Sequence, residues 1–146
     1  MNRKAKPSRS EKGFTLVELL LVIAIIAIMA SLVISAFSNA SSDSRLVLAH
    51  QQQAVVQQAV NSWIAYASAS SRSLFDAKAA YAAAGTTTRA RLDLVKAYLD
   101  DATYAQFTGT GDVQTDAMSK TSQVLQITGW ADGSYPKVNL VTASSE

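Results

Sequence analysis

The longest hydrophobic segment of the chain runs from Phe14 to Ile34 and contains one charged residue, Glu18, among 21 positions. Apolar residues occupy every side of a helix built from this segment, as contact with lipid or with identical helices requires. A helix of this length is about long enough to cross the roughly 30 Å hydrocarbon core of a membrane. The pattern therefore predicts a membrane-spanning helix. The carboxylate near its start indicates a functional role, because an ionisable group is unfavourable there.

The hydrophobic pattern changes after a cluster of small and polar residues at 35–42, where we expect the helix to leave the membrane. Apolar residues then recur at steps of three and four, which is typical of a helix with one buried face. One helix is therefore expected from Phe14 to about Ala69, with its second half packed on the rest of the chain. The predicted buried stripe consists of Leu48, Val56, Ala59, Val60, Trp63 and Ala67. The predicted polar face consists of Gln51, Gln52, Gln57, Gln58 and Asn61.

Two further helices are expected in the middle of the chain. The first covers 71–84 and is rich in alanine, and Gly85 provides a stop for it. The threonines at 86–88 offer hydroxyls to cap the next helix, which runs from Arg89 to about Ala102. The residues expected on one side of each helix are Leu74, Ala77, Tyr81 and Ala84 in the first, and Leu92, Val95, Lys96 and Leu99 in the second.

The last third of the chain changes to a strand pattern after a loop at 109–112. Polar and apolar residues alternate at 124–128 and again at 137–141, which predicts two short strands. The turn-rich residues 129–136 join them as a loose hairpin. The expected fold class is therefore α+β, with a long N-terminal helix packed on further helices and a small antiparallel sheet.

A specific motif marks the start of the hydrophobic segment: a basic leader, Gly13, the aromatic Phe14, and Glu18 four positions later. The sequence Lys12-Gly13-Phe14-Thr15-Leu16-Val17-Glu18 resembles the N-terminal signal of class III prepilins. These are the subunits of type IV pili and of the pseudopili of type II secretion systems. The resemblance covers roughly residues 8–45. It implies that prepilin peptidase cuts between Gly13 and Phe14, that Phe14 is then N-methylated, and that Glu18 sets the register of filament assembly.

The resemblance also implies how the chain is organised. Residues 1–13 would be the prepilin leader, 14–35 the transmembrane and assembly half of the first helix, and 36–146 a periplasmic globular domain with a pilin-like fold. The protein would be inserted once in the bacterial inner membrane and then extracted into a periplasmic or surface filament. Its partners would be prepilin peptidase, homologous pilin or pseudopilin subunits, and the inner-membrane assembly platform.

Charge and cysteine content refine this interpretation. The formal charge of +2 is misleading, because the leader holds five of the thirteen basic residues and one of the eleven acidic ones. After the cut, eight basic residues face ten acidic ones, a net charge of −2. The basic leader therefore indicates orientation in the membrane and not a nucleic-acid surface. The chain has no cysteine, whereas many type IV pilins close a C-terminal loop with a disulfide. This departure favours a type II secretion pseudopilin over a major or minor subunit of a type IV pilus.

Three other interpretations stay open at this stage. Ser38-Asn39-Ala40 is a passable cleavage site for an ordinary secretory signal peptide, although the apolar segment is longer than such signals usually are. The segment could also be a plain single-pass anchor. A non-polymerising, membrane-tethered binding module is the remaining alternative.

The sequence offers little for catalysis or for a cofactor. His50 is the one histidine and the chain has no cysteine, so no metal site is expected. No other cofactor is expected either. We do not expect an enzyme, because no pair of carboxylates is suited to acid–base catalysis. The loop aspartates Asp112, Asp116 and Asp132 lack the spacing of an EF-hand and are interpreted as solvated. A basic cluster of Arg89, Arg91 and Lys96 is interrupted by Asp93 and is too sparse to predict nucleic-acid binding. Trp63 and Trp130 are expected to pack in the core and in a loop.

Overall fold

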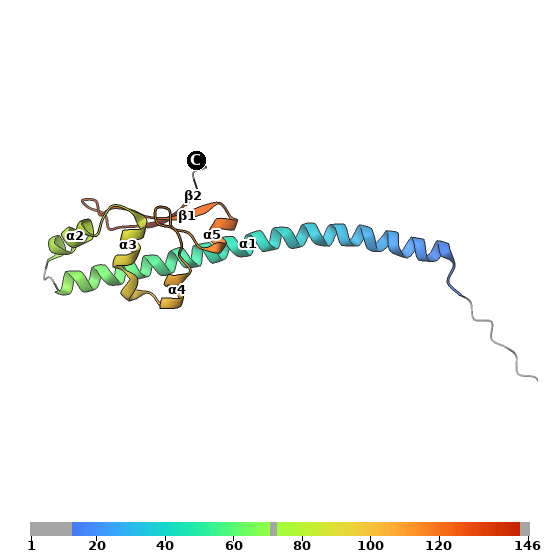
Figure 1. Cartoon of the computed structure of the whole chain (residues 1–146), viewed down its shortest axis with the longest axis horizontal. Coiled ribbons are helices and arrows are strands. Elements are labelled where there is room, and N and C mark those ends of the chain that lie inside the picture. The colour runs from blue at the N-terminus through green and yellow to red at the C-terminus, as the bar shows by residue number, and fades with distance from the viewer. Residues whose placement is uncertain (1–12, 71–72, 144–146) are drawn as a thin grey trace, which may run out of the picture. The chain divides into compact units, whose positions relative to one another are not determined.

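The computed structural model describes residues 13–70 and 73–143, which form two compact units, Met1–Asn39 and Ala40–Glu146. The α+β class is confirmed: one long helix is followed by shorter helices and a two-stranded antiparallel sheet (Figure 1). The elements are α1 (Leu16–Ser70), α2 (Leu74–Ala83), α3 (Thr88–Leu94), the 3-10 helix η1 (Lys96–Tyr98), α4 (Asp101–Ala105), α5 (Asp116–Lys120), β1 (Gln123–Ile127) and β2 (Val138–Thr142). The domain boundaries predicted at residues 13 and 35 stay predictions.

The predicted first helix is confirmed as α1, which begins at Leu16 instead of Phe14 and ends at Ser70. The small and polar residues at 35–42 do not interrupt it. Just beyond them, the hydroxyl of Ser44 donates to the carbonyl oxygen of Ala40 at 2.8 Å, and α1 continues through this bond.

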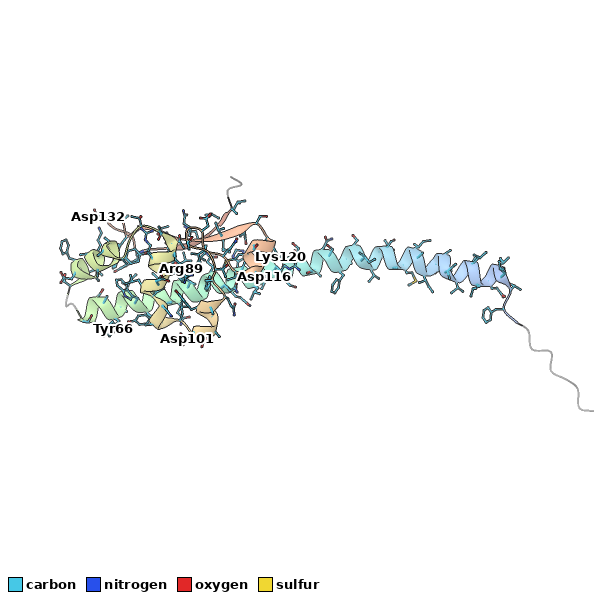
Figure 2. All side chains as sticks on the ribbon, viewed as in Figure 1. Tyr66, Arg89, Asp101, Asp116, Lys120 and Asp132 are labelled. Atoms are coloured by element: carbon cyan, nitrogen blue, oxygen red, sulfur yellow. The ribbon has the colours of Figure 1, made fainter. Side chains whose placement is uncertain are left out.

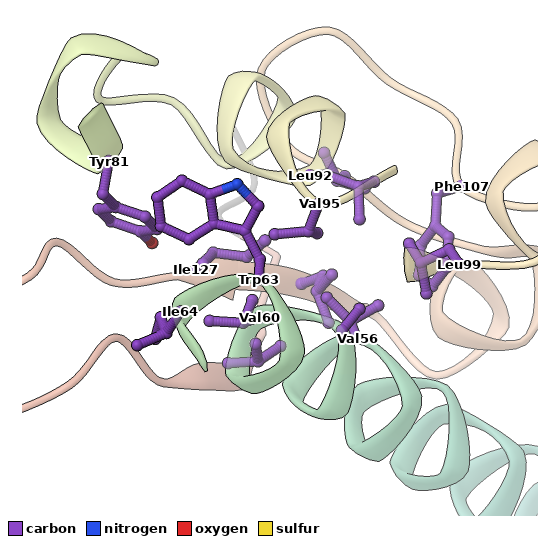
Figure 3. Close-up of a cluster of buried hydrophobic side chains, with 14 of the residues drawn as sticks. Val56, Val60, Trp63, Ile64, Tyr81, Leu92, Val95, Leu99, Phe107 and Ile127 are labelled. Atoms are coloured by element: carbon purple, nitrogen blue, oxygen red, sulfur yellow. The ribbon is translucent and has the colours of Figure 1, made fainter. Parts of the chain in front are cut away.

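The core of the second unit lies on the apolar stripe of α1, against α2, α3 and the sheet (Figure 3). Five of the six predicted stripe residues are buried, and Leu48 is the exception, with 44 % of its surface exposed. Ala49 is buried in its place, and Leu48 lines a surface hollow beside Asp116 and Ala117. The buried residues of α1 are Ala49, Gln52, Val56, Ala59, Val60, Trp63, Ile64 and Ala67.

Two glutamines of the predicted polar face of α1, Gln52 and Gln57, bind other elements, and so does the neighbouring Gln53. Gln52 is buried, donates to Gln106 at 2.9 Å and accepts from the hydroxyl of Thr115 at 2.7 Å. Gln53 donates to the carbonyl oxygen of Val138 at 2.7 Å, and the amide of Val138 donates to Gln57 at 2.7 Å. Gln53 and Gln57 satisfy backbone groups on the outer edge of β2, which lowers the cost of burying that edge.

The helix predicted over 71–84 is present as α2, which begins at Leu74 after the cap Ser73 and ends at Ala83; residues 71–72 lie outside the described residues. The predicted signals that follow it are confirmed as well. Gly85 follows α2 with a φ of +118°, a left-handed conformation that favours glycine. Thr87 then caps α3, since its hydroxyl accepts from the amide of Ala90. Only Ala77 and Tyr81 of the predicted inner side are buried. Leu74 is about half exposed, because it lies in the first turn beyond the edge of the core.

The prediction of one helix from Arg89 to about Ala102 is wrong, because the segment forms α3, η1 and the start of α4. Leu99 adopts an extended backbone with φ −110° and ψ 148°, which ends the helical run. Asp100 then caps α4, and its carboxylate accepts from the amide of Thr103 at 3.1 Å. A short polar side chain can recruit the free amides of a new helix start, and here that capping outweighs helical continuity.

The two predicted strands are confirmed, each shifted by one residue, and they pair antiparallel with Leu125 opposite Leu140. On the other edge of β1, the amide of Leu125 donates to the carbonyl oxygen of Val113 at 2.7 Å. The sheet therefore gains a single bridge from a preceding loop segment and no full third strand among the described residues. Helix α5 was not predicted; Thr115 caps it by accepting from the amide of Met118.

Candidate functional site

Gly13, Phe14 and Thr15 precede the first turn of α1 and are not helical. A Cβ atom added to Gly13 would meet no atom within 4 Å, and Gly13 does not have a positive φ. The described part of the chain therefore does not itself require glycine here. Any requirement for a residue without a side chain must come from a protein that acts on this position.

The start of α1 is a capping box formed by Thr15 and Glu18. The amide of Glu18 donates to the hydroxyl oxygen of Thr15 at 3.2 Å. In return, Glu18 Oε2 accepts from the amide of Thr15 at 2.8 Å and from its hydroxyl at 2.9 Å. This reciprocal arrangement satisfies two backbone amides that a helix start leaves unpaired. The carboxylate also lies at the positive end of the helix dipole, which is favourable.

The side chains that follow this cap are apolar and uncovered. Every described residue from 13 to 39 is exposed, and Phe14 has 82 % of its surface accessible. Among the described residues, α1 is the one helix long and apolar enough to cross a membrane. Because so large an apolar surface is unstable in water, lipid or neighbouring helices must cover it.

Each of the three basic residues of the predicted cluster contacts another element of the second unit. Arg89, labelled in Figure 2, pairs with Asp93 at 3.1 Å and donates to the carbonyl oxygen of Phe107 at 3.0 Å. Arg91 donates to the carbonyl oxygen of Ile127 at 2.6 Å. Lys96 lies over the ring of Tyr104, with its Nζ 4.7 Å from the ring centre. These side chains tie α3 to the sheet and to α4, so their charges are not gathered into a free basic surface.

The loop aspartates are spread over different elements. Asp116 lies at the start of α5, while Asp132 follows Trp130 and pairs with Lys78 of α2 (Figure 2). The hydrogen bond from Lys78 lowers the pKa of Asp132 below its usual value. His50 is exposed and contacts Gln53. Within the described ranges, no three histidine or acidic side chains lie close enough together to hold a metal ion.

Both tryptophans take part in one chain of aromatic contacts. Trp63 is buried and its ring centre lies 5.9 Å from that of Tyr81. Trp130 is partly buried, also 5.9 Å from Tyr81, and packs on Tyr135 at 5.5 Å. The expected packing roles of Trp63 and Trp130 are therefore met.

Comparison with known families gives one match. Residues 8–34 match the family described as the prokaryotic N-terminal methylation motif. No curated protein and no solved structure matches the chain. The chain thus carries the class III signal of pilin-like proteins, as the sequence predicts. Such a signal is processed by prepilin peptidase and precedes assembly with other pilin-like subunits.

The structure brings Thr15 and Glu18 together in a contact that was not predicted from the sequence. The signal was present, since Thr-x-x-Glu directly before an apolar run is the pattern of a capping box. Gly13 and Phe14 lie next to this cap, so the predicted cleavage site, methylation site and assembly residue fall within six consecutive positions. Their predicted roles stay predictions.

Proposed function

We propose that this protein is a structural subunit of a type II secretion pseudopilus. Prepilin peptidase removes residues 1–13, Phe14 is N-methylated, and α1 holds the subunit in the inner membrane until it is extracted into the filament. The second unit faces the periplasm. The subunit performs no reaction of its own.

The observation that carries this proposal is the match of residues 8–34 to the methylation motif, together with the uncovered apolar side chains of residues 13–39 that overlap it. An ordinary anchor needs the apolar helix alone, whereas a filament subunit needs both the signal and a surface that passes from lipid to neighbouring subunits. The absence of cysteine supports a pseudopilin over a type IV pilin, because many type IV pilins close a C-terminal loop with a disulfide.

The cleavage step is tested by the mass of the membrane-bound product in a host that has prepilin peptidase. We expect a product that begins with methylated Phe14. We expect Gly13→Val to leave the uncut precursor, because the added side chain obstructs the enzyme and not the chain itself. A product that begins at Ser41 would instead show an ordinary signal peptide and contradict the proposal.

The type of filament is tested by deleting the gene in its native host. Loss of protein secretion with normal surface motility supports a pseudopilin. Loss of surface pili or twitching with normal secretion would assign the subunit to a type IV pilus. If the protein is cut at Gly13 but never enters a sheared or cross-linked filament, it is a tethered binding module.

A further inference from the structure

The cap on α1 determines where the helix begins relative to the bond proposed to be cut. The first helical hydrogen bond between backbone groups runs from the amide of Leu19 to the carbonyl oxygen of Thr15 at 3.2 Å. Thr15 is thus the last residue before the helix, and the Gly13–Phe14 bond lies outside it. If the helix began two residues earlier, the carbonyl oxygen of Gly13 would lie in the first turn and accept from Val17.

Whether the carbonyl of Gly13 lies outside the helix or in its first turn affects cleavage, because a peptidase must reach and polarise the carbonyl of the bond that it cuts. A carbonyl that accepts a helical hydrogen bond is enclosed by the turn that follows it. A bond in extended backbone is open from both sides. The conformation of Gly13 and Phe14 therefore decides what fraction of the precursor is ready for cleavage.

We propose that Thr15 is a positioning residue for cleavage, which together with Glu18 stops α1 two residues after the Gly13–Phe14 bond and keeps that bond open to the peptidase. The inference rests on the proposed processing between Gly13 and Phe14. It adds a role for Thr15 and a second role for Glu18. In the uncut chain, Glu18 fixes the start of the helix through its two bonds to Thr15.

Two features of the local sequence act in the same direction. The hydroxyl of Thr15 holds the amide of Glu18, so Thr15 stabilises the capped arrangement and not a longer helix. Gly13 is a poor helix former, so helical growth past Phe14 is disfavoured as well. An alanine at position 15 would remove the cap and favour helix at the same time.

The experiment measures cleavage of the purified full-length precursor in detergent micelles by purified prepilin peptidase. For Thr15→Ala, we expect KM to rise about twofold with kcat nearly unchanged, because a smaller fraction of the precursor is competent to bind. The loss of a typical N-cap changes the ratio of open to helical precursor about fivefold. KM changes less than this ratio, because the open form predominates in the wild type. NMR should show the Cα shift of Phe14 moving towards helical values in this variant.

Two matched variants provide the controls. Thr15→Ser keeps the hydroxyl and should restore the wild-type KM and the non-helical shifts at Phe14. Glu18→Gln keeps an acceptor for Thr15, since glutamine also completes a capping box, but loses the charge at the helix start; its KM should therefore rise less than that of Thr15→Ala.

The remaining outcomes would refute either the positioning role of Thr15 or the proposed function. An unchanged KM for Thr15→Ala, with wild-type precursor cut at Gly13, would refute the positioning role and leave the proposed function intact. A slower reaction without a helical shift at Phe14 would mean that the peptidase contacts the hydroxyl directly, which also refutes it. Wild-type precursor that is not cut between Gly13 and Phe14 would refute the proposed function itself.

Discussion

Tyr81 shows how much of the second unit depends on one side chain. Its ring is 1 % exposed and packs between Trp63 and Trp130, while its hydroxyl donates to the carbonyl oxygen of Thr128 at 2.8 Å. Burial raises the pKa of Tyr81 to about 12, and the nearby Arg91 opposes the shift. The helical spacing placed Tyr81 on the inner side of α2. The hydrogen bond to the loop after β1 could not be predicted, because it depends on how distant elements pack.

The raised pKa of Tyr81 makes the fold sensitive to alkaline pH. Its folded pKa lies above the ordinary value of 10, so its contribution is complete below about pH 10 and is lost as the pH rises towards about 12. In Tyr81→Phe this contribution to the pH dependence should disappear. At neutral pH the variant should be about 1 kcal/mol less stable, because the Thr128 carbonyl loses its donor.

The measurement is urea unfolding of the full chain in detergent micelles at pH values from 7 to about 11, followed by tryptophan fluorescence. Tyr66→Phe is the control, since Tyr66 is exposed, and it should behave like the wild type. An equally steep alkaline loss in Tyr81→Phe would show that other groups cause it.

Among the helices and strands, those that follow from periodicity were predicted, as was the cap of α3 at Thr87, whereas the cap at Asp100 and the links between distant elements were missed. The first helix, α2 and both strands follow from their patterns, and the stop at Gly85 follows from local chemistry. The break at Leu99 was missed because the apolar spacing continues through it, and both Val95 and Leu99 are buried. A pattern of buried positions does not reveal that Asp100 starts a new helix.

The glutamines of α1 give the clearest test at this scale. Gln57 accepts from the amide of Val138 and donates to the carbonyl oxygen of Pro136, at 2.7 and 3.2 Å. Gln58 is the next residue and is exposed. Gln57→Ala should therefore lower the free energy of unfolding by about 1–3 kcal/mol, because the amide of Val138 is left without its acceptor. Gln58→Ala should change it by less than about 0.5 kcal/mol.

Urea unfolding and hydrogen exchange measure the two consequences separately. The amide of Val138 should be protected in the wild type and in Gln58→Ala, and should exchange faster in Gln57→Ala. If both variants have the same stability and the same protection at Val138, α1 does not hold the outer edge of β2 through Gln57.

The two units of the chain differ in how far their apolar side chains are buried. Residues 13–39 contain an uncovered apolar helix, whereas the core lies entirely among residues 49–138. The signal and the membrane helix could be predicted from sequence because they are local and depend on composition. The packing that joins α1 to the other elements of the second unit could not, since it depends on contacts such as that between Gln53 and Val138.

Glu18 has one proposed role in the uncut chain and another in the filament, and a single substitution separates them. Cleavage creates an amine on Phe14, which stays basic after one methylation. A neighbouring subunit shifted by about one helical turn would bring that amine level with Glu18. The pair would form in low dielectric, where opposite charges attract strongly, although desolvation offsets part of the gain.

Glu18→Gln should keep the cap and lose this attraction. It should still be cleaved and methylated, yet be nearly absent from cross-linked filaments, while Thr15→Ser enters them normally. Filaments that contain Glu18→Gln in the wild-type proportion would show that the charge of Glu18 has no part in assembly.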